Sequence, residues 1–214
     1  MTIDLYTWAT PNGRKVSVML EEVGLPYKEH AINISKGEQF QPDFLKISPN
    51  NRIPAIVDPD GPDGKPISVF ESGAILMYLG RKFGKFYPTD ERKRVAVEEW
   101  LMWQMGGFGP MLGQAHHFLQ FNKGKAPYAE ERYGKEANRL YGVLDKQLEG
   151  RDFIAGDYSM ADIAAWPWAS RWEWQGVDPA DFPNVKAWYV RVAGRPGVQK
   201  GYDVPARGNA IPMP

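Results

Sequence analysis

The spacing of hydrophobic residues changes once along this chain, in the stretch from Gly84 to Thr89. Before this stretch, short segments that alternate in polarity predict strands, and segments with apolar residues three or four apart predict helices. The predicted strands are 3–8, 27–34, 55–57 and 67–69. The predicted helices are 14–23, 39–45, which is expected to be short and irregular, and 71–82. A strand–helix–strand opening that closes on a hairpin and a last helix predicts a mixed sheet with helices, an α/β domain.

After Thr89 only helical spacing occurs, which predicts an all-α domain. A helix is expected from Asp90 past Trp103, with a bent continuation to Phe121. The later helices are expected at about 127–148, 159–174, 182–192 and 196–202. We therefore assign 1–83 to an α/β domain and 90–202 to an all-helical domain. Residues 203–214, with three prolines and few apolar anchors, are expected to be a mobile C-terminal tail.

Composition narrows the choice of partners and of chemistry. The 214 residues carry 26 basic and 26 acidic side chains, so the net charge is zero and neither nucleic acid nor a membrane is an expected partner. The N-terminus enters a strand pattern directly, so we expect no signal peptide, no membrane span and a cytoplasmic location. The chain has no cysteine, so any sulfur chemistry must be carried by a bound thiol.

Two segments together predict a receptor for a small peptide with a free acid end. The segment Asn51–Asp58 enters a strand at Pro54, where the ladder needs no N–H. A cis Ile53–Pro54 bond would turn the N–H and C=O of Ile53 outward, where they can pair with a ligand's backbone. Glu71 and Ser72 then begin a helix, whose N–H groups and dipole attract a carboxylate. The alternative for these two residues is a plain helix cap with an acid beside it.

A second candidate group lies between the first strand and the first helix. The Thr10 hydroxyl or the Asn12 amide could donate a hydrogen bond to a thiolate, which lowers the pKa of the thiol. The alternative is that one of them only caps the helix, and the residue types alone favour the cap.

Several other motifs predict structure rather than chemistry. The glycine-rich run Gly106–Pro110 predicts a kink or a break in a helix. His116 and His117 are adjacent and would point about 100° apart on a helix, so no metal site is expected. Ser159–Asp162 has the form of a capping box. Arg132 and Arg139 share a helix face, where either could reach a carboxylate or form a surface salt bridge.

The motifs also match a known family. Thr10-Pro11-Asn12-Gly13 stands where a thioredoxin fold usually carries C-x-x-C, and Pro54 stands at the position of its cis-proline. Together with the helical domain and its capping box, these motifs resemble the glutathione transferases over nearly the whole chain. The segments that resemble the bacterial Nu class, relatives of the yeast prion protein's transferase-like domain, are 10–13, 47–58, 70–76 and 106–111.

The resemblance implies a thioredoxin-like N-terminal domain, an all-α C-terminal domain, a homodimer, glutathione as co-substrate and no metal. It places the γ-glutamyl carboxylate on Ser72, aided by Glu71, and the cysteinyl backbone on Ile53 ahead of Pro54. It places the glycyl end near Gln39 and Arg52. The implied glutathione-binding residues are thus Gln39, Arg52, Ile53, Pro54, Glu71, Ser72 and Arg132.

The activity implied by the Nu-class resemblance is glutathione-dependent disulfide-bond reduction, with weak glutathione transferase or peroxidase activity on small disulfides or electrophiles. Thr10 and Asn12 match the catalytic positions that address the sulfurs, and Arg132 matches an arginine that holds a second glutathione. The Tyr or Ser that activates the thiol in other classes has no counterpart here, which argues against strong conjugation. Two alternatives stay open: conjugation of electrophiles as the main task, and a non-catalytic glutathione-binding module.

Overall fold

The structure of this chain is a computed structural model that describes residues 2–206 and 208–214. By their internal contacts these residues fall into two compact units. The first comprises Met1–Lys85 with Arg195–Ile211, and the second comprises Phe86–Gly194 with Pro212–Pro214. In the residues described, all strands belong to the first unit, and the second is built from helices.

The first unit contains the mixed sheet that the sequence predicts. Its strands are β1 (Ile3–Thr7), β2 (Tyr27–Ala31), β3 (Ala55–Asp58) and β4 (Ile67–Phe70). They lie in the order β2-β1-β3-β4, with β1 parallel to β2 and β3 antiparallel to both of its neighbours. The second strand ends earlier than expected, because Asn33 starts a 3₁₀ turn by accepting a hydrogen bond from the Ser35 N–H.

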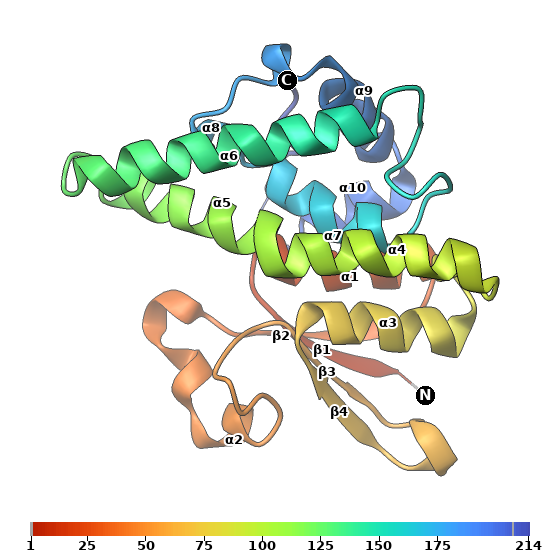
Figure 1. Cartoon of the computed structure of the whole chain (residues 1–214). Coiled ribbons are helices and arrows are strands. Elements are labelled where there is room, and N and C mark those ends of the chain that lie inside the picture. Colours follow the sequence, from red (N-terminus) through yellow and green to blue (C-terminus); the bar gives the residue numbers. More distant parts are fainter. Residues whose placement is uncertain (1, 207) are drawn as a thin grey trace. The chain divides into compact units, whose positions relative to one another are not determined.

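Helices α1 (Pro11–Val23) and α3 (Ser72–Phe83) pack side by side, and α3 also lies along β3 and β4 (Figure 1). The short, irregular helix expected at 39–45 consists of a 3₁₀ turn, Glu38–Phe40, followed by the short α2 (Pro42–Leu45). The start of α1 comes very close to the end of β1. A Cβ at Gly13 would collide with the main chain of Trp8, so only glycine allows this approach.

Helix α10 (Pro196–Tyr202) belongs to the first unit, although we expected 196–202 within the helical domain. It packs closely on α1 because Gly201 has no side chain: a Cβ there would lie 2.6 Å from Cα of Val18. The Ser17 hydroxyl donates to the Gly201 carbonyl at 2.6 Å. Helical spacing shows that 196–202 is a helix, but it does not show which unit the helix contacts.

The C-terminal segment is packed where the structure describes it, although we expected a mobile tail at 203–214. Val204 is buried, and the Asp203 carboxylate accepts hydrogen bonds from the N–H groups of Gly208 and Asn209 at 3.1 and 2.8 Å. The Tyr189 hydroxyl donates to the Pro212 carbonyl at 2.8 Å. Arg207 lies outside the described residues.

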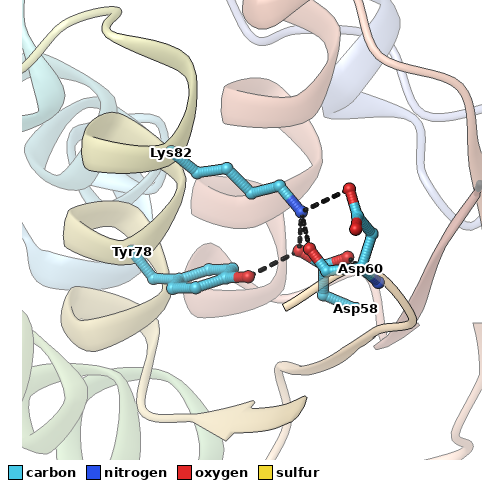
Figure 2. A network of polar contacts seen from close by, with 4 residues as sticks. All are labelled: Asp58, Asp60, Tyr78 and Lys82. Atoms are coloured by element: carbon cyan, nitrogen blue, oxygen red, sulfur yellow. Dashed lines mark hydrogen bonds and ion pairs between the residues drawn. The ribbon is translucent and has the colours of Figure 1, made fainter. Parts of the chain in front are cut away.

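A buried carboxylate ties the β3–β4 hairpin to α3 (Figure 2). Asp58, at the end of β3, is 2% exposed and accepts hydrogen bonds from the Tyr78 hydroxyl and the Lys82 ammonium, both at 2.6 Å. Burial alone would raise the pKa of Asp58, but these bonds and one from the Asp60 N–H lower it overall. The stabilisation is therefore present at neutral pH and is lost as the pH falls through the depressed pKa. This contact helps to fix α3, whose first residue is Ser72.

The second unit is built from six α-helices in its described part. They are α4 (Glu91–Trp103), α5 (Gly109–Ala115), α6 (Pro127–Gln147), α7 (Met160–Ala169), α8 (Trp172–Gln175) and α9 (Pro183–Ala193). The expected kink at Gly106–Pro110 takes the form of a π-helical turn, Gln104–Phe108, which leads from α4 into α5 without a break (Figure 1). A wider turn suits this position, because Pro110 has no N–H to continue an ordinary helix.

The expected helix 159–174 ends at Ala169, and a new short helix follows. The Trp168 carbonyl accepts from the Arg171 N–H, three residues on, at 3.2 Å and from the side chain of Gln175 at 2.8 Å, and these bonds satisfy it where the helix ends. The start of α7 agrees with the prediction. Ser159 and Asp162 form the capping box. The Asp162 carboxylate accepts from the Ser159 N–H, and the Ser159 hydroxyl accepts from main-chain N–H groups in the first turn of α7.

Candidate functional site

The turn between β1 and α1 places Thr10 and Asn12 at the start of a helix. Thr10 is the N-cap residue of α1, and its Oγ1 accepts a hydrogen bond from the Gly13 N–H at 3.2 Å. The cap alternative is thus confirmed for Thr10. A hydroxyl has one donor hydrogen besides its two lone pairs, so capping leaves Thr10 able to donate as well. Both side chains are partly exposed, as contact with a ligand requires.

The peptide bond between Ile53 and Pro54 is cis, which meets the condition set by the sequence argument. Within the described part of the chain, neither the N–H nor the C=O of Ile53 takes part in a hydrogen bond. The loop ahead of it is held by Ser48, whose hydroxyl donates to the Arg52 carbonyl at 2.8 Å. Ile53 is partly exposed, so both of its main-chain groups can pair with the backbone of a bound peptide.

Ser72 is not a helix cap, which corrects that alternative. It is the first residue of α3, the N-cap is Glu71, and no side-chain hydrogen bond caps this end. Glu71 has φ of 69°, a left-handed conformation that is unfavourable for a residue with a side chain and is typical of functional sites. The start of α3 therefore presents uncapped N–H groups and the positive end of the helix dipole, which suits an anion.

A lysine that the sequence argument missed contacts Ser72. Lys15, on α1, is 1% exposed, and its Nζ donates to Ser72 Oγ at 3.3 Å. Ser72 itself is 4% exposed. Burial lowers the pKa of Lys15 to about 7, and the negative charge of Glu71 acts in the opposite direction. The only signal in the sequence was that Lys15 lies beside the apolar stripe of its helix. Such a position can be buried, although lysines rarely are.

Gln39 and Arg52 differ in how they are placed. Gln39 lies on the 3₁₀ turn Glu38–Phe40 and is 8% exposed, and its Oε1 is buried without a hydrogen-bond partner among the described residues. A buried acceptor without a donor is unfavourable, and a bound ligand could supply that donor. The side chain of Arg52 is exposed.

Arg132 lies in the second unit, on the exposed side of α6, with its guanidinium carbon 5.8 Å from the centre of the Tyr133 ring. Arg139, its alternative on the same helix face, makes a two-pronged ion pair with Glu136 at 2.8 Å for both bonds. Arg139 thus matches the surface salt-bridge interpretation.

His116 is held as a neutral side chain. Gln175 Nε2 lies 3.0 Å from His116 Nε2 and also donates to the Trp168 carbonyl. Burial, with the nearby Arg171 as a smaller cause, lowers the pKa of His116 to about 4. Across residues 2–206 and 208–214 no three His, Cys, Asp or Glu side chains gather in a way that could hold a metal ion. None of the helices described there is both long and apolar enough to cross a membrane.

Comparison with known proteins identifies the family. Residues 1–81 match the family model "Glutathione S-transferase, N-terminal domain", and residues 105–196 match "Glutathione S-transferase, C-terminal domain". The chain belongs to the glutathione S-transferase family.

The similar curated proteins include two from Escherichia coli strain K12. The chain is 52% identical over 196 residues to the disulfide-bond oxidoreductase YfcG, covering 91% of each protein. It is 42% identical over 214 residues to the disulfide-bond oxidoreductase YghU, covering 93% of this chain and 73% of that one.

Solved structures of similar proteins contain glutathione. A glutathione transferase from Burkholderia graminis with two glutathione molecules per subunit matches with a TM-score of 0.90 and 46% identity, covering 97% of this chain and 90% of that one. One from Pseudomonas putida with one glutathione disulfide per subunit matches with a TM-score of 0.93 and 43% identity, covering 96% and 92%.

Proposed function

We propose that this protein is a glutathione-dependent disulfide-bond reductase that uses the thiols of bound glutathione, with weak glutathione transferase or peroxidase activity. One observation carries the proposal: a chain without any cysteine is 52% identical to a disulfide-bond oxidoreductase over 91% of its length. A protein with no thiol can reduce a disulfide only with a thiol that it binds. The two glutathiones, or one glutathione disulfide, seen in the similar structures fit this role.

The first unit supplies the binding groups for the first glutathione in this proposal. The γ-glutamyl carboxylate binds Ser72 at the uncapped start of α3, and Glu71 pairs with the γ-glutamyl ammonium. The main chain of Ile53, beside Pro54, pairs with the cysteinyl backbone. Gln39 and Arg52 take the glycyl end, whose amide N–H is the donor for the buried Gln39 Oε1. Arg132, in the second unit, is assigned to the second glutathione.

The chemistry is two thiol–disulfide exchanges. A glutathione thiolate attacks one sulfur of the substrate disulfide, the S–S bond breaks, and a substrate thiolate leaves and takes up a proton. The second glutathione thiolate attacks the mixed disulfide, so glutathione disulfide forms and the second substrate thiol is released. Thr10 and Asn12 stabilise the attacking thiolate by hydrogen bonds. The protein thus contributes proximity and charge stabilisation, and glutathione contributes the nucleophile.

The Nu-class resemblance carries three finer parts of this proposal: membership of that class, a homodimer and a cytoplasmic location. The long motifs at 47–58 and 70–76 support the class, because they include Ile53, Pro54, Glu71 and Ser72.

Replacing Ser72 by alanine is expected to raise the Michaelis constant for glutathione about 10-fold, because a hydrogen bond to a charged group is lost. The turnover number should change much less, since Ser72 contacts the end of glutathione that does not react. Initial rates at varied glutathione measure both values. A Michaelis constant equal to that of the parent would contradict the assigned carboxylate site.

A further inference from the structure

The buried amine beneath the start of α3 carries an inference beyond the assigned binding residues. Lys15 is 1% exposed, on the turn of α1 that faces Ser72. Lysines are rarely buried without a hydrogen-bonding or charged partner, because transfer of their charge from water is unfavourable. Its hydrogen bond to Ser72 places the amine directly behind the residue assigned to the γ-glutamyl carboxylate.

For the charged form of Lys15, the direction of this hydrogen bond follows from the chemistry of the two groups. An ammonium has donors and no acceptor, so Ser72 Oγ is the acceptor in its bond with Lys15. This bond therefore does not use the hydrogen of the Ser72 hydroxyl, which a bound carboxylate can accept. A chain from ammonium to hydroxyl to carboxylate is the arrangement in which each bond strengthens the next.

The charged groups around Lys15 leave the site suited to an anion. From the start of α3, Glu71 is the carboxylate whose charge acts on the amine. On α1 itself, the neighbouring Arg14 is directed to α10, where its guanidinium carbon lies 3.7 Å from the centre of the Tyr202 ring. Also from the α10 side, Arg195 pairs with Glu22 at 2.7 Å. The dipole of α3 adds positive potential at the same place, which a bound carboxylate would offset.

We propose that Lys15 is a positioning residue for glutathione, whose ammonium acts through Ser72 to hold the γ-glutamyl carboxylate, so that binding takes up a proton at neutral pH. The inference rests on the proposed function and adds a residue and a pH dependence to it. With a pKa of about 7, the amine is partly neutral in the free protein at neutral pH. A bound carboxylate favours the charged amine, so affinity falls as the pH rises through and above 7.

The test is titration calorimetry with S-methylglutathione, whose blocked thiol cannot titrate. Titrations of the parent at pH 6, 7 and 8, each in two buffers with different heats of ionisation, give the affinity and the protons taken up. We expect fractional proton uptake at pH 7 and a decrease of roughly 10-fold in affinity between pH 6 and 8. Binding by the parent that is independent of pH and takes up no proton would overturn the proposal.

Two variants and a control separate the amine from general effects of charge. Lys15→Met should bind about 10- to 100-fold more weakly, with no pH dependence from 6 to 8. Lys15→Arg should bind like the parent at pH 6 but keep that affinity at pH 8, because a guanidinium stays charged. This second variant gives the answer even where the first fails to fold. Lys28→Met, which removes an exposed lysine of β2, should behave like the parent.

The outcomes distinguish this inference from the proposed function. If the parent fails to bind S-methylglutathione at every pH, the glutathione site itself is wrong. If the parent binds with a pH dependence that Lys15→Arg retains, glutathione binding stands and the role of Lys15 is overturned.

Discussion

Replacing Asp162 by alanine is expected to lower the free energy of unfolding by about 4 kcal/mol, because it leaves several buried donors without a partner. Asp162 is fully buried in the second unit. Its Oδ1 accepts from the Ile154 N–H and from the Trp188 ring N–H, both at 2.9 Å, and its Oδ2 accepts from the Ser159 N–H at 3.0 Å. One carboxylate therefore joins the start of α7, the loop before it and α9.

The size of this loss should depend on pH in a definite direction. Burial raises the pKa of Asp162 to about 6, although its hydrogen bonds act in the opposite direction. The folded protein then binds a proton more tightly than the unfolded chain, so this group's stabilisation decreases as the pH rises from about 4 through about 6. The difference between parent and variant should be about 1 kcal/mol smaller at pH 7.5 than at pH 5.

Urea denaturation of both proteins at these two pH values measures the effect. Asp157→Ala is the matched control, since Asp157 is an exposed acid shortly before the same helix. Its ion pair with Lys93, at 3.3 Å, lies on the surface. It should change the stability by less than about 0.5 kcal/mol. A loss below about 1 kcal/mol for the Asp162 variant would mean that its hydrogen bonds contribute little.

Replacing Asn12 by alanine is expected to reduce disulfide turnover by about 10- to 100-fold, the value of one hydrogen bond to a charged group. The affinity for S-methylglutathione should stay within about 3-fold of the parent, because the assigned contacts to the peptide ends are untouched. The loss of the Asn12 hydrogen bond should also change the pH dependence of the rate. Without the Asn12 donor the pKa of the bound thiol rises, so the rate reaches its plateau at higher pH.

Initial rates with a small disulfide at pH 6 to 9 measure both effects. Thr10→Ser is the matched control: it keeps the hydroxyl that caps α1 and should keep most of the activity. An Asn12 variant with the parent's rate and pH profile would remove Asn12 from the mechanism.

The sequence predicts elements and local contacts well where the cause is local. The strand predicted at 55–57 follows from its apolar run, the cap at Thr10 from its residue type, and the capping box at Ser159–Asp162 from its spacing. Each depends on residues within a few positions of one another, so the signal lies within one short window.

What the sequence does not predict depends on contacts between distant segments. Lys15 becomes a site residue only because Ser72, 57 positions away, comes within 3.3 Å of it. The packing of α10 on α1 likewise depends on Gly201 meeting Val18 across the length of the chain. A helical pattern gives the face of a helix but not its neighbour, so these contacts could be found only in three dimensions.

The central claim is that a chain without cysteine reduces disulfides with the thiols of bound glutathione. The most direct measurement follows the purified protein with glutathione on a small disulfide and, side by side, on a halogenated aromatic, with the uncatalysed rates subtracted. We predict a rate that saturates with the disulfide, forms one glutathione disulfide for each disulfide consumed, and exceeds the rate of aromatic conjugation. No disulfide turnover above the uncatalysed rate, at glutathione concentrations that saturate binding, would contradict the account.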